Sequence, residues 1–273
     1  MSSMASFGIG SWFRPWLVLL VLAASCQPSL AQICTFWDMG CIDPFAQTAV
    51  SVSLPPLFLE DVSLYYAFDV NSQGKGRGPM TKSAFWLGYD SNPRINSSVI
   101  DANRTSEVGM RVGNLTGTPG GGNNGCDNIW GPRCSRDLID LIKGNIFALA
   151  TSGNYYSYPL DAVLHEMLAA KPALSNCAPS LWDVQDIWVD YFVQESVADR
   201  TATIQTPGDS DSPWRNFLLD GLTASQQAEQ VAVAIFSRAP SYDSGPPETK
   251  DEIDVNLVCV QAPSSGSSSS SDD

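Results

Sequence analysis

CDNIWGPRCSRDLIDLIKGNIFALATSGNYYSYPLDAVLHEMLAAKPALSNC, residues 126–177, is the stretch around which this chain is organised. It holds three of the seven cysteines, the only histidine and the two clearest consecutive helical patterns. This combination predicts a helical core that is cross-linked by disulfides. It does not match a catalytic motif of known chemistry.

The first helix of this stretch is predicted to run from Ser135 to about Ser152. Ser135 suits an N-cap because its hydroxyl can accept a hydrogen bond from an unpaired amide of the first turn. Gly153 stands where a C-terminal cap would follow. The apolar residues recur at three- and four-residue spacings, which predicts a broad buried face. They are Leu138, Ile139, Leu141, Ile142, Ile146, Phe147 and Leu149.

A second helix is predicted to begin at Pro159, which suits the first helical turn, and to end before Pro172. The connection between the two helices is short, so the helices are expected to be antiparallel neighbours. The apolar stripe of the second helix comprises Leu160, Val163, Leu164, Met167 and Leu168.

The composition is that of a soluble, acidic protein with enough apolar residues for a sizeable core. The chain has 273 residues, of which 44% are hydrophobic, and its formal net charge is -14. Phosphate recognition needs clustered Lys and Arg. The charge therefore argues against nucleic acid as a partner and against simple attraction to anionic lipid.

The N-terminus has the pattern of a secretory signal peptide, residues 1–31. Arg14 precedes an apolar run, WLVLLVLAASC, that is too short to span a bilayer. Small residues then end at Ala31, so cleavage is predicted there and the mature chain begins at Gln32. An uncleaved membrane anchor is the alternative interpretation. The prediction is an extracellular, secreted protein without a stable membrane span after cleavage.

Removal of the signal peptide leaves an even set of cysteines, which in a secreted chain predicts disulfides. The six are Cys34, Cys41, Cys126, Cys134, Cys177 and Cys259. The spacing does not choose among the pairings. Cys34 with Cys41 and Cys126 with Cys134 are the local pairs, and Cys177 with Cys259 would then close a long loop. Metal ligation is disfavoured because no CxxC pair exists and only one histidine is present.

Residues 91–125 form the least core-like interior region of the chain. Three glycosylation sequons behind a signal peptide predict an exposed, N-glycosylated surface there. The acceptors are Asn96, Asn103 and Asn114. GTPGGGNNG at 117–125 is predicted to be a flexible connector and marks a sub-boundary within the domain.

Strict alternation of apolar residues predicts strands at residues 62–70 and 85–89. The glycine-rich connection at 71–82 is predicted to be an exposed hairpin loop. After the helical stretch, residues 223–238 predict a third helix, with Thr223 and Gln226 forming a capping box. A strand is predicted at 253–259, and the Ser-rich tail, 263–273, is predicted to be disordered.

The predicted fold class is therefore α+β, disulfide-linked, with an antiparallel β-rich N-terminal half and a helical C-terminal half. Residues 32–262 are predicted to form a single secreted domain that includes the sub-boundary at 117–125.

Motifs for nucleophilic or metal-dependent catalysis are absent from the sequence. A Ser-His-acid site would have to use His165, and no GxSxG elbow is present. HEMLA has Ala169 where a zincin needs its second histidine. We therefore predict no metal and no cofactor, and interpret His165 as a helix-surface or partly buried residue.

A pair of carboxylates is the one catalytic arrangement that composition leaves open, because glycoside hydrolysis needs only two acids. Asp183, Asp186 and Asp190 stand among aromatic residues that could stack on a sugar, although such aromatics more often belong to a core. The acids considered are Asp38, Asp43, Glu60, Asp61, Asp137, Asp140, Glu166, Asp183, Asp186, Asp190 and Glu195. The aromatic residues among them are Trp182, Trp188 and Tyr191.

Four short segments resemble segments of uncharacterised secreted proteins from filamentous fungi. They are GCD at 125–127, SPW at 212–214, QQAEQVAV at 226–233 and SRAPSY at 237–242. The resemblance implies a fungal extracellular glycoprotein and supplies no activity or catalytic residue. The function expected is a structural or binding role at the cell surface or in the extracellular matrix, with glycans or cell-wall polysaccharide as partner. A secreted carbohydrate-active hydrolase is the alternative.

Overall fold

The computed structural model describes residues 33–34, 41–42, 46–54, 62–73, 79–88, 103–184, 187–192, 203–205, 215–217, 226 and 229–262. The predicted signal peptide, the Ser-rich tail, Asn96 and residues 74–78 of the hairpin connection lie outside these residues. All of the described elements belong to one compact unit, Gln32–Asp273.

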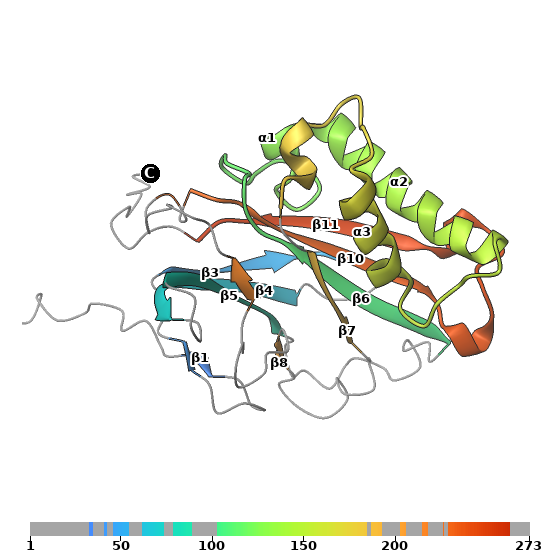
Figure 1. Cartoon of the computed structure of the whole chain (residues 1–273), viewed down its shortest axis with the longest axis horizontal. Coiled ribbons are helices and arrows are strands. Elements are labelled where there is room, and N and C mark those ends of the chain that lie inside the picture. The colour runs from blue at the N-terminus through green and yellow to red at the C-terminus, as the bar shows by residue number, and fades with distance from the viewer. Residues whose placement is uncertain are drawn as a thin grey trace, which may run out of the picture. The chain divides into compact units, whose positions relative to one another are not determined.

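A four-stranded antiparallel sheet lies between a second sheet and the helices (Figure 1). Its strands, in spatial order, are β11 (Asp254–Val260), β10 (Ala232–Pro240), β6 (Arg104–Arg111) and β7 (Ile187–Phe192). The paired register places Ile235 of β10 opposite Leu257 on one side and Gly109 on the other.

The second sheet is built from the N-terminal strands. It consists of β3 (Ala46–Val52), β4 (Val62–Gln73), β5 (Pro79–Gly88) and β8 (Thr203–Gln205), and β9 (Arg215–Phe217) also pairs with β5. β4 and β5 confirm that strands form where alternation predicted them, but both extend into the predicted loop at 71–82, since residues 71–73 and 79–82 belong to the strands. Tyr66 and Phe85 stack across them with ring centroids 4.8 Å apart. A separate pair joins β1 (Ile33–Cys34) to β2 (Cys41–Ile42).

The helices follow in the middle of the chain. They are α1 (Asp127–Trp130), α2 (Pro132–Thr151) and α3 (Pro159–Ala170), followed by the short 3-10 helices η2 (Pro179–Trp182), η4 (Tyr242–Ser244) and η5 (Lys250–Glu252). α2 and α3 confirm the two predicted helices, including the end near Ser152 and the start at Pro159.

The predicted N-cap at Ser135 is wrong. α2 begins three residues earlier at Pro132, whose missing amide hydrogen makes it a good first helical residue. Ser135 is instead fully buried inside the helix. Its Oγ donates to Asp127 Oδ1 over 2.7 Å and accepts from Trp130 Nε1 over 2.9 Å. The hydroxyl therefore joins α1 to α2.

Two apolar cores lie on opposite faces of the four-stranded sheet, one toward the second sheet and one toward α2 and α3. β10 supplies side chains to both. Ala232, Ala234 and Phe236 belong to the first core, whereas Val233 and Ile235 belong to the second. The successive side chains of a strand point to opposite faces, so this strand separates the two cores.

The helix predicted at 223–238 is wrong, because its apolar part is the strand β10. Residues 230–239 are all buried. A strand that is covered on both faces has no polar face, and its continuous apolar run cannot be distinguished from a buried helix by periodicity. Thr223 of the proposed capping box lies outside the described residues.

The predicted layout of a β-rich N-terminal half and a helical C-terminal half is also wrong. The helices occupy the middle of the chain, and β10 and β11 near the C-terminus form half of the four-stranded sheet. The error follows from β10, because reassigning that one segment moves the C-terminal part from helical to β.

The segment 91–125, predicted to be the least core-like, contains a central strand. Residues 106–111 of β6 are all buried. Sequence reasoning missed it because β6 carries Arg104, Glu107 and Arg111, and buried charged residues are rare unless they are paired or hydrogen-bonded.

The described residues contain two disulfides, Cys126–Cys259 and Cys134–Cys177. The candidate pairings Cys126–Cys134 and Cys177–Cys259, between which the sequence did not decide, are therefore excluded. The backbones of Cys34 and Cys41 lie opposite each other in the β1–β2 ladder. Disulfides form and persist in oxidising compartments, so the observed pair is consistent with an extracellular protein.

Residues 117–125 form a closely hydrogen-bonded loop, whereas their composition predicted a flexible connector. Gly120 N donates to Gly125 O over 2.8 Å, and Cys259 N donates to Asn124 O over 3.0 Å. A Cβ at Gly120 would lie 2.4 Å from Asn128 Nδ2, so this glycine permits the close approach. The loop is held against both α1 and β11.

Candidate functional site

The connection between α2 and α3 turns back over the end of β10. Ser152 N donates to Ala148 O and Asn154 N donates to Leu149 O, which satisfies carbonyls at the end of α2. Gly153 has a φ of 76°, a conformation that a side chain disfavours. The chain then runs through three tyrosines before α3 begins.

Tyr155 anchors this connection. Its side chain is buried, and its hydroxyl donates to Pro240 O at the end of β10 over 2.7 Å. Burial raises the pKa of Tyr155 above its ordinary value, and the nearby Glu107 acts in the same direction. The hydroxyl therefore stays protonated and keeps the donor that the contact requires.

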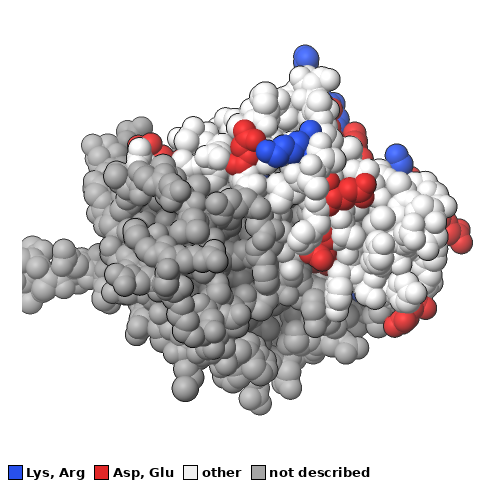
Figure 2. All heavy atoms as spheres, in the orientation of Figure 1, with Lys and Arg blue, Asp and Glu red and all other residues white. Residues whose placement is uncertain are grey.

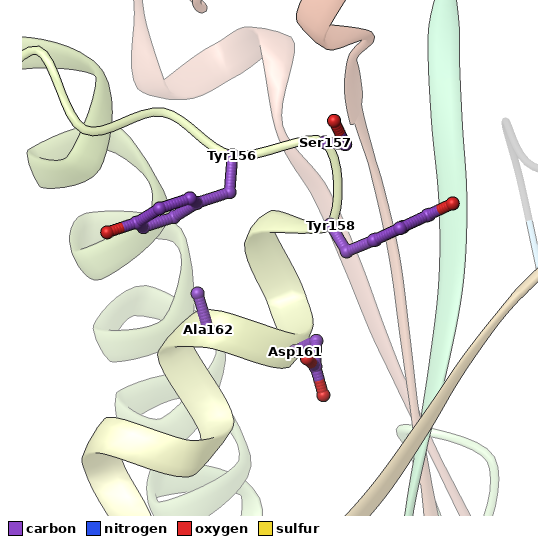
Figure 3. A pocket seen from close by; sticks show the side chains of 5 residues that line it. All are labelled: Tyr156, Ser157, Tyr158, Asp161 and Ala162. Atoms are coloured by element: carbon purple, nitrogen blue, oxygen red, sulfur yellow. The ribbon is translucent and has the colours of Figure 1, made fainter.

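Tyr156 and Tyr158 are exposed and line a shallow pocket of about 370 Å³ together with Ser157, Asp161 and Ala162. Their exposed fractions are 51% and 42%, which is unusual for large aromatic residues next to a core. Figure 3 shows the two rings extending to either side of the loop, with Asp161 and Ala162 on the first turn of α3.

The Asp161 carboxylate is paired with the only histidine. Its Oδ1 lies 3.1 Å from His165 Nδ1, which also lies 2.9 Å from Asp161 O. The side chains are 46% and 58% exposed, so His165 is a helix-surface residue as predicted. An exposed pair of this kind is weak and leaves the carboxylate accessible to a ligand.

Glu107 of β6 lies against the first turn of α3, next to residues that line the pocket. It is fully buried, and its carboxylate accepts from Leu160 N over 2.9 Å and from Asp161 N over 3.1 Å. Burial raises the pKa of Glu107 to about 8, while the two amide hydrogen bonds act in the opposite direction. The amides that begin α3 are thus already occupied from within the protein.

Glu107 and Asp161 were absent from the carboxylates that the sequence singled out. The sequence held a partial signal for Asp161, since it is an acid in the first turn of a predicted helix beside Tyr-rich residues. The sequence held no signal for Glu107, because the burial of Glu107 depends on the pairing of β6 with strands that are distant in sequence.

The aromatic and acidic residues near position 182 were considered as a sugar-stacking surface, but Trp182 cannot contribute to one. That side chain is buried, and its Nε1 donates to Pro172 O over 2.9 Å. Asp183 is exposed and pairs with Lys171 Nζ at 3.2 Å. Only the backbones of Trp188, Asp190 and Tyr191 are described, and Asp186 lies outside the described residues.

The remaining sequence-selected acids do not converge on the pocket. Asp137 accepts from Asn176 Nδ2 over 2.6 Å, an exposed contact away from the tyrosines. Asp140 and Glu166 are exposed on α2 and α3 and do not line the pocket. The acids outside the described residues are Asp38, Asp43, Glu60, Asp61 and Glu195.

Two of the three predicted glycosylation acceptors are described, and both are exposed. Asn103 immediately precedes β6, and Asn114 follows it in a left-handed conformation with a φ of 50°. One amide hydrogen of Asn114 is donated to Asp183 O over 2.6 Å, which leaves the other free for a sugar. Their exposure fits the surface position that the sequons predict.

Among the residues that the structure describes, no group of three or more His, Cys, Asp or Glu side chains is placed to hold a metal ion. None of the helices in the described segments combines the length and the apolar character needed to cross a membrane. On the described part of the face in Figure 2, Lys and Arg stand singly among Asp and Glu.

Comparison of the chain with protein-family models, with curated proteins and with solved structures found no match. A function for this protein therefore has to be inferred from the geometry of the pocket that Tyr156 and Tyr158 line.

Proposed function

We propose that the protein is a secreted fungal glycoprotein with a binding role at the cell surface or in the extracellular matrix, and that the pocket formed by the α2–α3 connection and the first turn of α3 holds one saccharide unit. The observation that supports this most directly is the pair of exposed rings, Tyr156 and Tyr158, beside the accessible carboxylate of Asp161.

The chemistry of the lining suits a neutral sugar. A tyrosine ring offers a flat apolar face to the C–H face of a sugar and a hydroxyl at its outer end. The Asp161 carboxylate can accept hydrogen bonds from sugar hydroxyls, and Ser157 can both donate and accept. These groups come from one short loop and one helical turn, so the site is small.

A site with so few contacts implies weak binding to each saccharide unit. An aromatic contact is worth on the order of 1 kcal/mol, and a total near 4 kcal/mol corresponds to a Kd of about 1 mM. A repetitive polymer presents the same saccharide unit many times, which raises the local ligand concentration around a single weak site. Cell-wall polysaccharide is therefore a more suitable partner than a single small sugar.

Binding is favoured over hydrolysis because the pocket presents a single carboxylate. Glycoside hydrolysis needs two acids facing each other across the sugar. Glu107, which contacts the amides of the first turn of α3, does not line the pocket, is fully buried and accepts from two backbone amides. It cannot reach a sugar in the pocket.

The proposal is tested by titrating the secreted protein with a panel of hexose- and N-acetylhexosamine-based oligosaccharides. We expect Tyr156→Ala and Tyr158→Ala each to weaken binding roughly five- to tenfold, which corresponds to about 1 kcal/mol. Glu166→Ala is the control, because Glu166 is exposed on α3 but does not line the pocket.

Absence of binding across the panel, or equal binding by the pocket variants and the control, would overturn the proposed function. Release of reducing sugar from wall polysaccharide by the wild type would instead favour the hydrolase. Melting temperatures of all variants show that any loss of binding is not a loss of folding.

A further inference from the structure

Tyr242 is the most exposed of the large apolar side chains in the described residues, with 59% of its surface accessible. It belongs to η4, the short 3-10 helix that follows β10. Single exposed aromatic residues are common on protein surfaces, and what distinguishes Tyr242 is the contact of its neighbours with a glycosylation sequon.

The backbone around Tyr242 is tied directly to Asn103. Ser241 N donates to Asn103 O over 2.6 Å, and Ser244 Oγ donates to the same oxygen over 2.7 Å. Arg104 and Pro240 are paired in the β6–β10 ladder, which brings the two chain segments to one end of the sheet. Residues on both sides of Tyr242 thus contact Asn103.

Asn103 begins the sequon Asn103-Arg104-Thr105 and is exposed. The intervening Arg104 side chain is directed to β11 and η5, where it donates to Glu252 O and pairs with Asp254 Oδ2 at 3.5 Å. The Arg104 guanidinium therefore has partners on β11 and η5. The segment that contacts the Asn103 carbonyl instead carries the exposed Tyr242.

We propose that Asn103 carries an N-linked glycan whose first sugar stacks on the ring of Tyr242. This rests on the secreted, glycosylated part of the proposed function and not on the saccharide pocket. The glycan would be attached to the residue whose carbonyl accepts hydrogen bonds from the residues on both sides of Tyr242, so its effective concentration near the ring would be high and a weak contact would be sufficient. The tyrosine is then the docking surface for the protein's own modification.

The modification itself is a group transfer from a lipid-linked pyrophosphate oligosaccharide in the secretory pathway. A bond forms between C1 of the first sugar and Asn103 Nδ2, and the bond between C1 and the pyrophosphate oxygen breaks. Nδ2 gives up one proton, and the lipid pyrophosphate is the leaving group. Asn103 keeps its backbone carbonyl for the contacts with Ser241 and Ser244.

The test is a double-mutant cycle on the full chain secreted from a eukaryotic host, with site occupancy measured by peptide mass spectrometry. We expect Asn103 to be glycosylated, and Asn103→Gln to lower the Tm by about 2–4 °C. In the Tyr242→Ala background the same substitution should lower the Tm by much less. Tyr242→Phe should retain the full effect, because the ring face is kept.

The matched control removes the glycan at Asn114 through Thr116→Ala, an exposed position. Its effect on the Tm should be the same in the wild type and in the Tyr242→Ala background. Enzymatic trimming of the native glycoprotein to one sugar per site should leave the Tm effect intact, and complete removal should abolish it. This arm needs no substitution and covers the case in which a variant is not secreted.

An unoccupied Asn103 would overturn the inference, and so would equal effects of Asn103→Gln in the two backgrounds. Neither result bears on the oligosaccharide titration of the Tyr156 and Tyr158 variants. The failure of this inference and the failure of the saccharide pocket are therefore distinguishable.

Discussion

The buried ionisable residues Glu107 and Arg111 of β6 are the most informative residues of the described structure, because each is hydrogen-bonded to backbone groups. Glu107 accepts from two amides at the start of α3. Arg111 donates to the carbonyls of Leu181, Gly113 and Ser180 at 2.6–2.9 Å, and its burial lowers its pKa to about 10. Hydrogen bonds of this kind offset the cost of burying these polar groups and orient the helices on the sheet.

The pH dependence of stability should report on Glu107. In the unfolded chain this carboxyl ionises near its ordinary pKa of 4.5, whereas in the folded protein burial raises the pKa to about 8. The folded state therefore binds more protons between these values, and its stability falls as pH rises through this window, by up to about 1.4 kcal/mol per unit. The stabilising contribution is complete below pH 4.5 and is lost above pH 8.

Glu107→Gln should remove this slope, because glutamine does not titrate and can still accept one of the two amides. The measurement is urea unfolding of both proteins at about pH 5 and about pH 8, which lie between the unfolded and the folded pKa of Glu107. Tyr155 and Asp161, the other titratable groups beside this carboxyl, are unchanged in the variant. Glu166→Gln, on the exposed side of α3, is the control and should keep the wild-type slope. An unchanged slope in Glu107→Gln would contradict the assignment.

At the scale of elements, the position of α3 on the sheet depends on a glycine. A Cβ built on Gly109 of β6 would lie 2.5 Å from Leu164 Cδ1, which is far below a normal contact. Leu164 is fully buried, so a shift of its side chain would press on neighbouring residues of the core. The absence of a side chain at Gly109 thus allows α3 to pack directly on β6.

Gly109→Ala should destabilise the protein by about 1–3 kcal/mol, the usual cost of overpacking a core. Gly144→Ala is a matched control within α2, since its nearest neighbour would be Lys250 Nζ at 3.5 Å. That substitution should be neutral or stabilise by about 0.5–1 kcal/mol, because alanine favours a helix interior. Denaturant unfolding measures the change in the free energy of unfolding for each variant. Equal changes in the two variants would show that the position of α3 does not depend on the missing side chain at Gly109.

At the scale of the whole molecule, the two disulfides connect segments that are distant in sequence. Cys126–Cys259 spans 133 residues and joins the start of the helical stretch to β11. Cys134–Cys177 spans 43 residues and joins the start of α2 to the segment after α3. The first disulfide therefore attaches the helical stretch to the sheet, and the second attaches α2 to the segment that follows α3.

Removing the longer bridge should cost more stability than removing the shorter one. The chain-entropy relation gives about 5 kcal/mol for Cys126–Cys259 and about 4 kcal/mol for Cys134–Cys177. Guanidinium unfolding of the two double-alanine variants measures the difference. Peptide mapping without reduction should recover these two cross-links, whereas a Cys126–Cys134 link would contradict the structure. The same map tests Cys34–Cys41, which stays a prediction.

Local sequence determined the elements whose signals are local. The amphipathic periods of α2 and α3, the proline at position 159 and the alternation of β4 depend on neighbouring residues, and each was predicted from them. The exposed setting of His165 also followed from its place on a helix. Such features need no knowledge of what lies on the other side of the element.

Tertiary structure alone decided which face of each element is covered and which residues meet. β10 is a strand because β6 and β11 pair with it and both of its faces are buried, a condition that its apolar run cannot specify. The disulfide partners, the burial of Glu107 and the exposure of Tyr156 and Tyr158 likewise arise from contacts between residues far apart in the chain. Local propensity is a weak energy beside such packing, so these features became visible only in the folded protein.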